Sequence, residues 1–126
     1  MTHDHFVLVV EDDADCRELV AELLAESGFK TETAANGAEA LERLRQHRES
    51  ICVIVLDLMM PIMNGWEFRA AQLKDEHMRE VPVLVLTADS RAQIKVDDLA
   101  PAGYLAKPVD PGKLLELISQ HCPRAH

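Results

Sequence analysis

Three apolar segments of the chain, at residues 6–10, 51–56 and 81–86, each end in side chains that could do chemistry. They are followed, in order, by Glu11-Asp12-Asp13, by Asp57 and by Thr87. Long Val, Ile and Leu runs are typical of strands buried on both faces of a parallel sheet, whose carboxyl ends meet at one edge. Ligands bind at that edge in open α/β folds. The sequence therefore predicts a site that gathers several carboxylates and a hydroxyl.

Carboxylates that converge repel one another, which disfavours their ionisation unless a cation is present. Mg²⁺ is the predicted cation, because it takes oxygen ligands from one or two carboxylates, from water and from phosphate. Lys107, which follows a short apolar segment at 104–106, adds a positive charge. This combination suits a phosphoryl group. The carboxylate of Asp57 would attack phosphorus to form an acyl phosphate, while the metal and Lys107 neutralise the phosphoryl oxygens.

Helical patterns alternate with the apolar segments. Helices are predicted from about Ala14 to Ser27, from Asn36-Gly37, from Asn64 or Gly65, and from Pro111 after an N-cap at Asp110. Residues 30–34 and 104–106 are predicted as short strands. Five βα units of this kind predict an α/β fold: a doubly wound, five-stranded parallel sheet with helices on both faces.

Two features of the helices are less regular. The buried stripe predicted for the first helix consists of Cys16, Leu19, Val20, Leu23 and Leu24. Residues 90–99 could be helical or irregular, and the segment stops at a proline at position 101. If this segment is helical, it would be a fourth helix that is shortened or displaced.

The composition excludes several classes of function. Thirteen basic and 22 acidic residues give a net charge of −9, which argues against nucleic acid as a ligand. No apolar stretch approaches the roughly 20 residues that span a bilayer, and the N-terminus lacks the features of a secretion signal. A cytoplasmic protein without membrane contact is expected. Three widely spaced cysteines, at positions 16, 52 and 122, predict neither a disulfide framework nor a zinc site, and Cys16 and Cys52 are expected in the core.

Four strings stand in order at successive strand ends: VLVVEDD at 7–13, VLDLMMPIMNG at 55–65, VLVLTA at 83–88 and YLAKP at 104–108. Together they resemble the receiver domain of two-component response regulators, the CheY-like family, over nearly the whole chain. Each string alone is a weak signal, but the combination is specific. The resemblance implies that Asp57 accepts a phosphoryl group from a phosphohistidine on a sensor histidine kinase or a histidine phosphotransfer protein.

The resemblance also implies a role for each matching residue. Asp12 would bind Mg²⁺ directly, Glu11 would bind it through water, and Asp57 and the carbonyl oxygen of Met59 would complete the protein ligands. Thr87 would hydrogen-bond the phosphoryl group and Lys107 would pair with it. The Lys107–Pro108 peptide bond would be cis, and Tyr104 would be the aromatic switch residue that turns inward when Thr87 moves.

The chain departs from the family pattern before the fifth strand, where Gly103 and Tyr104 are adjacent and Pro101 stands where the fourth helix usually ends. The face of the fourth helix, fifth strand and fifth helix is expected to contact a downstream protein. We expect one receiver domain over 1–126 without an output domain. Such a chain either acts by binding another protein or is a piece of a longer regulator.

Other interpretations remain open. Glu11-Asp12-Asp13 could cap the first helix and do nothing more. A magnesium-dependent phosphohydrolase would use the same aspartate, but such enzymes usually carry a second acid two residues later, where this chain has Met59. A phosphorylation-independent scaffold would need none of these side chains. We therefore expect a signalling domain whose only turnover is the gain and loss of its own phosphate.

Overall fold

The computed structural model describes residues 5–47, 49–87 and 100–122. Its centre is a five-stranded sheet in which every neighbouring pair of strands is parallel. The strands are β1 (Phe6–Val10), β2 (Lys30–Ala34), β3 (Ile51–Asp57), β4 (Val83–Thr87) and β5 (Gly103–Ala106). Their order across the sheet is β2-β1-β3-β4-β5. The winding therefore reverses between β1 and β3, which confirms the predicted doubly wound α/β fold.

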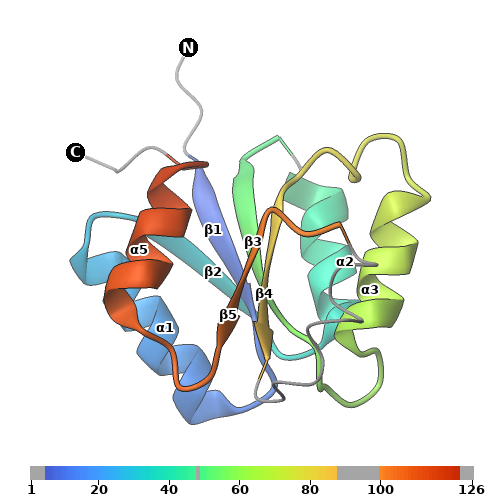
Figure 1. Ribbon diagram of the computed structural model, residues 1–126. Helices are drawn as coiled ribbons and strands as arrows, with labels where there is room; N and C mark the ends of the chain where they lie inside the picture. The colour runs from blue at the N-terminus through green and yellow to red at the C-terminus, as the bar shows by residue number, and fades with distance from the viewer. Residues whose placement is uncertain (1–4, 48, 88–99, 123–126) are drawn as a thin grey trace.

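Four helices cover the sheet in the described ranges: α1 (Ala14–Glu26), α2 (Gly37–His47), α3 (Gly65–Leu73) and α5 (Pro111–Ser119). Figure 1 shows α1 and α5 on one face of the sheet and α2 and α3 on the other. This two-sided cover explains why the central strands β1, β3 and β4 are almost continuously apolar, since neither face of these strands meets water. No helix in these ranges is long and apolar enough to cross a membrane.

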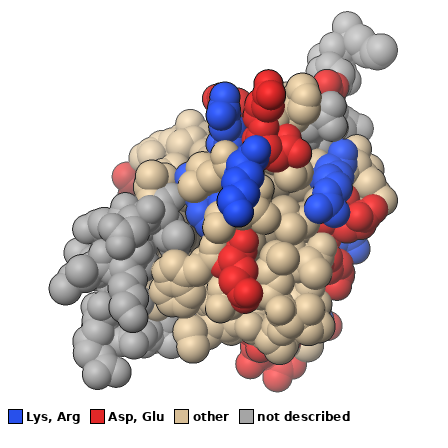
Figure 2. Space-filling view, turned by 90° about the vertical axis from the view of Figure 1, so that its right-hand side faces the viewer, with Lys and Arg blue, Asp and Glu red and all other residues tan. Residues whose placement is uncertain are grey.

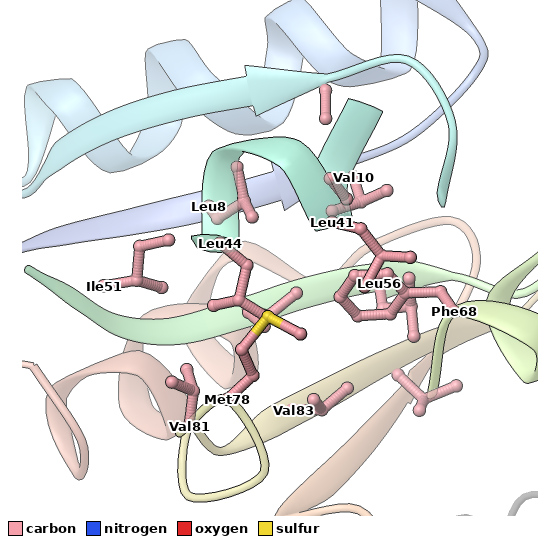
Figure 3. Close-up of a cluster of buried hydrophobic side chains, with 14 of the residues drawn as sticks. Leu8, Val10, Leu41, Leu44, Ile51, Leu56, Phe68, Met78, Val81 and Val83 are labelled. Carbon is pink, nitrogen blue, oxygen red and sulfur yellow. The ribbon is translucent and has the colours of Figure 1, made fainter. Parts of the chain in front are cut away.

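The core consists of two clusters, one on each side of the sheet, and β1 contributes to both. Leu8 and Val10 belong to the cluster under α2 and α3, while Val7 and Val9 belong to the cluster under α1 and α5. Successive side chains of a strand point to opposite faces, so this alternation follows from the pleat. In the first cluster Phe68 of α3 packs among aliphatic side chains of the sheet and of α2 (Figure 3).

The predicted helix starts agree with the structure. Asp110 caps α5 by accepting a hydrogen bond from the backbone N–H of Gly112 at 2.9 Å. Asn64 caps α3 and forms a reciprocal capping box with Glu67. The third apolar segment becomes a strand only at Val83, two residues later than its apolar run. The predicted fourth helix lies outside the described residues.

One residue of the predicted buried stripe of α1 is exposed, and two others, Cys16 and Leu23, are only partly buried. Leu19 is 65% exposed, whereas Val20 and Leu24 are buried in the core. Val20 and Leu24, which are four residues apart, lie on the face of the helix that meets the sheet, whereas Leu19 lies outside this face. The prediction was wrong for Leu19, which leaves an exposed apolar side chain on α1.

The structure also corrects the prediction for the cysteines. It pairs Cys52, at the start of β3, with Cys122, just beyond α5, and their Cα atoms are 5.4 Å apart. Cys52 and Cys16 are only partly buried, whereas Cys122 is buried. The two paired residues are 70 positions apart in the chain, so only the folded topology reveals that they meet.

Candidate functional site

The carboxyl ends of the strands bring the chemistry-bearing residues to one edge of the sheet. Glu11 directly follows β1, Asp57 is the last residue of β3, Thr87 is the last of β4 and Lys107 follows β5. Figure 1 shows these strand ends together at the lower edge of the sheet. Glu11 and Asp57 therefore stand on the two strands between which the winding reverses, the usual place of a ligand site in such folds.

A charged cluster occupies this edge. The Lys107 Nζ atom lies 2.6 Å from Glu11 Oε1 and 3.6 Å from Asp57 Oδ1. Glu11 is fully buried and Asp57 is 4% exposed, whereas Asp12 is exposed to solvent. Ligand oxygens of Glu11, Asp12 and Asp57 all lie within 4.8 Å of one another. Three carboxylates thus share a single nearby ammonium group among the described residues, which leaves the cluster with excess negative charge.

This donor set fits a magnesium ion. All three side chains offer oxygen atoms, which are the ligands that Mg²⁺ prefers. The second carboxylate oxygen of Glu11 is buried and has no hydrogen-bond partner among the described residues. A buried acceptor of this kind is costly unless something satisfies it. An ordered, metal-bound water would do so.

The pKa values of the cluster point the same way. Burial, followed by the hydrogen bond and the negative charge of Glu11, raises the pKa of Asp57 to about 6. Burial and the neighbouring Asp57 raise the pKa of Asp12 as well. Lys107 shows the opposite response: burial disfavours its charged form, but the hydrogen bond to Glu11 and the charge of Asp57 outweigh this and raise its pKa. The positive charge of one lysine therefore does not balance the repulsion among the three carboxylates.

The loop after β3 is built to hold Asp57 in place. The backbone N–H of Met59 donates to Asp57 Oδ1 at 3.3 Å, and the N–H of Gly65 donates to the carbonyl oxygen of Leu58 at 3.0 Å. A Cβ atom on Gly65 would lie 2.8 Å from the backbone oxygen of Asp57 and from Leu58 Cα. Only glycine permits this close approach of α3 to the end of β3.

The same loop contains a strained residue. Ile62 has a φ of 68°, in the left-handed region, and its side chain is 81% exposed. This conformation is unfavourable for a β-branched residue, whereas asparagine tolerates it. We expect Ile62→Asn to raise the free energy of unfolding by about 1 kcal/mol, measured by urea denaturation. Ile62→Thr is the control, because threonine is polar but still β-branched. An equal gain in both variants would show that polarity and not backbone strain is responsible.

The remaining predicted residues take varied positions. Asp13 is the N-cap of α1 and accepts a hydrogen bond from the backbone N–H of Cys16, so it lies outside the carboxylate cluster. Thr87 is buried beside β5, and its carbonyl oxygen accepts from the backbone N–H of Lys107. Tyr104 lies on β5 with an exposed side chain, and the side chain of Met59 is also exposed. The Lys107–Pro108 peptide bond is cis.

The arrangement matches a known family. The family model for the response regulator receiver domain matches residues 7–119. The chain belongs to the response-regulator receiver family. This receiver is 32% identical to the chemotaxis response regulator CheY4 of Vibrio cholerae, whose structure superposes with a TM-score of 0.83 over 96% of this chain and 100% of that one.

Curated relatives agree with this assignment. The receiver is 36% identical over 115 residues to a probable transcriptional regulator, ycf29, of Pyropia yezoensis, covering 90% of this chain and 51% of the relative. It is 31% identical over 115 residues to the response regulator Rre1 of Synechocystis, covering 89% of this chain and 49% of the relative. The chain thus spans about half the length of these curated relatives.

A groove borders the charged cluster of the receiver, between α1 and the segment that follows β5. Its volume is about 420 Å³. The apolar residues that line it are Leu19, Val20, Leu23, Pro108, Val109 and Pro111. Lys107 also lines the groove, so the groove leads directly to the cluster. Sequence reasoning missed it, because the pattern of α1 assigned Leu19 to the core.

The sequence also missed the partner of Lys107. The resemblance assigned Lys107 to the phosphoryl group, but in the structure its shortest contact is with Glu11. The two residues are 96 positions apart. No local signal marks this pair. The pair could have been inferred from a physical requirement: a buried carboxylate needs a counter-charge, and Lys107 lies at the same edge of the sheet.

Proposed function

We propose that the protein is a phosphorylation-controlled switch whose Asp57 accepts a phosphoryl group from a phosphohistidine of a sensor histidine kinase or a histidine phosphotransfer protein. The observation that carries this proposal is the placement of Asp57: a buried carboxylate at a strand end, crowded by Glu11 and Asp12 and 3.6 Å from the ammonium group of Lys107. A carboxylate with a nearby cation and a metal-binding partner is suited to phosphoryl transfer.

The proposed reaction needs little from the protein beyond position and charge. An Asp57 oxygen forms a bond to phosphorus as the bond from phosphorus to the donor imidazole nitrogen breaks, and the imidazole keeps the electron pair. Glu11, Asp12, Asp57 and the carbonyl oxygen of Met59 would hold Mg²⁺, which supplies positive charge to the phosphoryl oxygens. Lys107 would leave Glu11 to pair with the new phosphoryl group.

The switch would then follow from the change in charge. Thr87 would hydrogen-bond the phosphoryl group, and Tyr104, which is exposed in this structure, would turn inward. Such a change shifts an existing equilibrium between two conformations. A downstream protein would recognise the phosphorylated conformation by binding the face that includes β5 and α5.

The partners proposed here are proteins and not nucleic acid. The net charge is −9, and the face in Figure 2 carries basic side chains interspersed with acidic ones, without a continuous basic band. A polyanion would be repelled by the overall charge and would find no basic surface on this face.

A phosphohydrolase is the weaker alternative. Such an enzyme needs a general acid for its leaving group, and the residue two positions after Asp57 is Met59, which cannot supply a proton. A constitutive scaffold is also weaker, because a scaffold has no need of a buried carboxylate cluster that burial and like charge destabilise.

Intact-mass spectrometry tests the proposal. Wild type and Asp57→Asn are incubated with Mg²⁺ and a small acyl-phosphate donor. We expect one phosphoryl adduct on the wild type, no adduct without Mg²⁺, and none on the variant. An unmodified wild type whose Mg²⁺ binding has been demonstrated separately would favour the scaffold, and rapid turnover of a chromogenic phosphate ester would favour the hydrolase.

We also propose that the donor protein docks in the groove beside α1. The groove is apolar, it leads to Lys107, and Leu19 exposes an apolar side chain at its wall. We expect Leu19→Asp to slow transfer from a phosphohistidine protein by about tenfold or more, since a charge must then be desolvated. Phosphorylation by the small donor should not change.

The control is Leu73→Asp, because Leu73 is another exposed leucine, at the end of α3 on the opposite face of the sheet. Rates of transfer are compared by following the phosphorylated donor protein over time. Equal rates in both variants, or slower modification of Leu19→Asp by the small donor as well, would contradict docking at this groove.

A further inference from the structure

The paired cysteines lie at the end of the sheet opposite the charged cluster. Cys52 is the second residue of β3, five residues before Asp57, and Cys122 lies three residues beyond the last residue of α5. In Figure 1 the start of β3 and the end of α5 are both at the upper end of the molecule, and the site is at the lower end. The pair therefore belongs to no part of the proposed phosphorylation site.

The backbone brings these residues to the spacing of a disulfide. Their Cα atoms are 5.4 Å apart, within the roughly 4.4–6.8 Å found in disulfides, and the two sulfur atoms are in contact. The neighbourhood is apolar: Cys122 belongs to the core cluster under α1 and α5, which includes Leu114 and Ile118, and Cys52 packs against the same cluster. No local movement of the backbone is needed to join them.

The surroundings also suit the reduced pair. The Cys52 sulfur lies 3.2 Å from the carbonyl oxygen of Phe6, to which a thiol can donate a hydrogen bond. A disulfide sulfur has no hydrogen to donate. A reduced Cys52 would therefore have a hydrogen-bond acceptor in a largely apolar site, where cysteine behaves as a small hydrophobic residue.

We propose that Cys52 and Cys122 form a reversible disulfide that ties the end of α5 to the start of β3. The oxidant would be a small disulfide such as oxidised glutathione. The thiolate of Cys52, the less buried of the two, attacks one glutathione sulfur and releases one glutathione thiolate. The thiolate of Cys122 then attacks the Cys52 sulfur of the mixed disulfide and releases the second glutathione thiolate. Two protons and two electrons leave the protein, and glutathione accepts the electrons.

The consequence is a covalent tie between a peripheral helix and a central strand. α5 covers one side of the sheet, and Leu114 and Ile118 are its buried contacts. A bond between residues 70 positions apart restricts the unfolded chain strongly. We expect the oxidised protein to melt roughly 10 °C above the reduced protein.

Counting of free thiols tests the proposal. Wild type, Cys16→Ser and Cys52→Ser are equilibrated with mixtures of oxidised and reduced glutathione, quenched with acid, unfolded, and alkylated with a maleimide. Intact mass then gives the number of free thiols. We expect oxidised wild type to carry one alkylated thiol, located at Cys16 by peptide mapping. Oxidised Cys16→Ser should carry none, and Cys52→Ser should form no intramolecular disulfide.

Thermal melting of the same samples completes the test. The shift between oxidised and reduced protein should appear in wild type and in Cys16→Ser and be absent from Cys52→Ser. Three free thiols in wild type at every glutathione ratio would overturn the proposal. So would a crosslink lost in Cys16→Ser, a crosslink between two molecules, or oxidised and reduced protein that melt at the same temperature.

Discussion

Replacing Lys107 with methionine is expected to lower the free energy of unfolding of the metal-free protein by about 3 kcal/mol at pH 7.5. Lys107 lies 2.6 Å from the fully buried Glu11 and 3.6 Å from Asp57. Methionine keeps most of the side-chain volume but removes the ammonium group. Glu11 would then be a buried carboxylate without a counter-charge, next to a second one. Removal of one partner from a buried ion pair is far more costly than removal of an exposed one.

The destabilisation caused by Lys107→Met should decrease at high pH. The pKa of Lys107 is raised in the folded protein, despite burial, by its hydrogen bond to Glu11 and by the charge of Asp57. The folded state therefore holds this proton more tightly than the unfolded state. The stability that follows is fully present below the unfolded pKa of about 10.5 and is lost as the pH rises through the higher folded value. The difference between wild type and Lys107→Met should therefore shrink above pH 10.5.

Mg²⁺ should offset part of the stability that Lys107→Met loses. Without Lys107, the Glu11 and Asp57 carboxylates lose the ammonium group that pairs with them, so Mg²⁺ should bind about tenfold more tightly, which corresponds to about 1.4 kcal/mol. Saturating Mg²⁺ should thus recover part of the lost stability.

Urea denaturation with and without Mg²⁺ measures both effects of the lysine substitution. The control is Lys113→Met, because Lys113 is an exposed lysine on α5 and its loss changes the net charge equally. Equal destabilisation by the two variants would mean that net charge matters and the contact with Glu11 does not. Weaker Mg²⁺ binding by Lys107→Met would show that the lysine does not compete with the ion for the carboxylates.

The elements that position the site could be predicted because their signals are local. The apolar run at 51–56 and the acid that follows it predicted β3 and the place of Asp57, and the Asp110-Pro111 dipeptide predicted the start of α5. A parallel sheet then brings the carboxyl ends of its strands to one edge. The gathering of Glu11, Asp57 and Lys107 follows from topology, without any knowledge of distances.

What could not be predicted depends on contacts between distant segments. The contact of Cys52 with Cys122 spans 70 residues and that of Glu11 with Lys107 spans 96. The amide group of Gln72, fully buried on α3, donates to the carbonyl oxygens of Met78 and Val81 and so holds the connection to β4. A periodic pattern identifies the apolar face of a helix, but it does not reveal which polar side chains find partners inside.

Replacing Asp57 with asparagine is expected to raise the free energy of unfolding of the metal-free protein by about 2 kcal/mol at pH 7.5, while it abolishes phosphorylation. Burial and the charge of Glu11 raise the pKa of Asp57 from 3.8 to about 6, so ionisation is less favourable in the folded state than in the unfolded state. This difference in pKa corresponds to about 3 kcal/mol, which is an upper value because the cluster can relax. Asparagine has nearly the same shape and no charge.

The stability gained by Asp57→Asn should depend on pH, because the pKa of Asp57 is raised in the folded state. Between pH 4 and pH 6 the folded state binds more protons at Asp57 than the unfolded state does, so the contribution of this group to stability falls as the pH rises through that range. The advantage of Asp57→Asn over wild type should therefore be smaller at pH 5 than at pH 7.5, by about 1 kcal/mol. Exposed acids do not give this pattern, and Glu116→Gln on α5 serves as the matched control.

Magnesium should reverse the order of stability. A cation bound to Asp57 offsets the unfavourable burial of the Asp57 negative charge, so saturating Mg²⁺ should stabilise wild type more than Asp57→Asn. Urea denaturation at pH 5 and 7.5, with and without Mg²⁺, measures all of these differences. A variant less stable than wild type without metal would mean that Lys107 already compensates the charge of Asp57 in full. The crowding of carboxylates would then no longer support a metal site at this edge of the sheet.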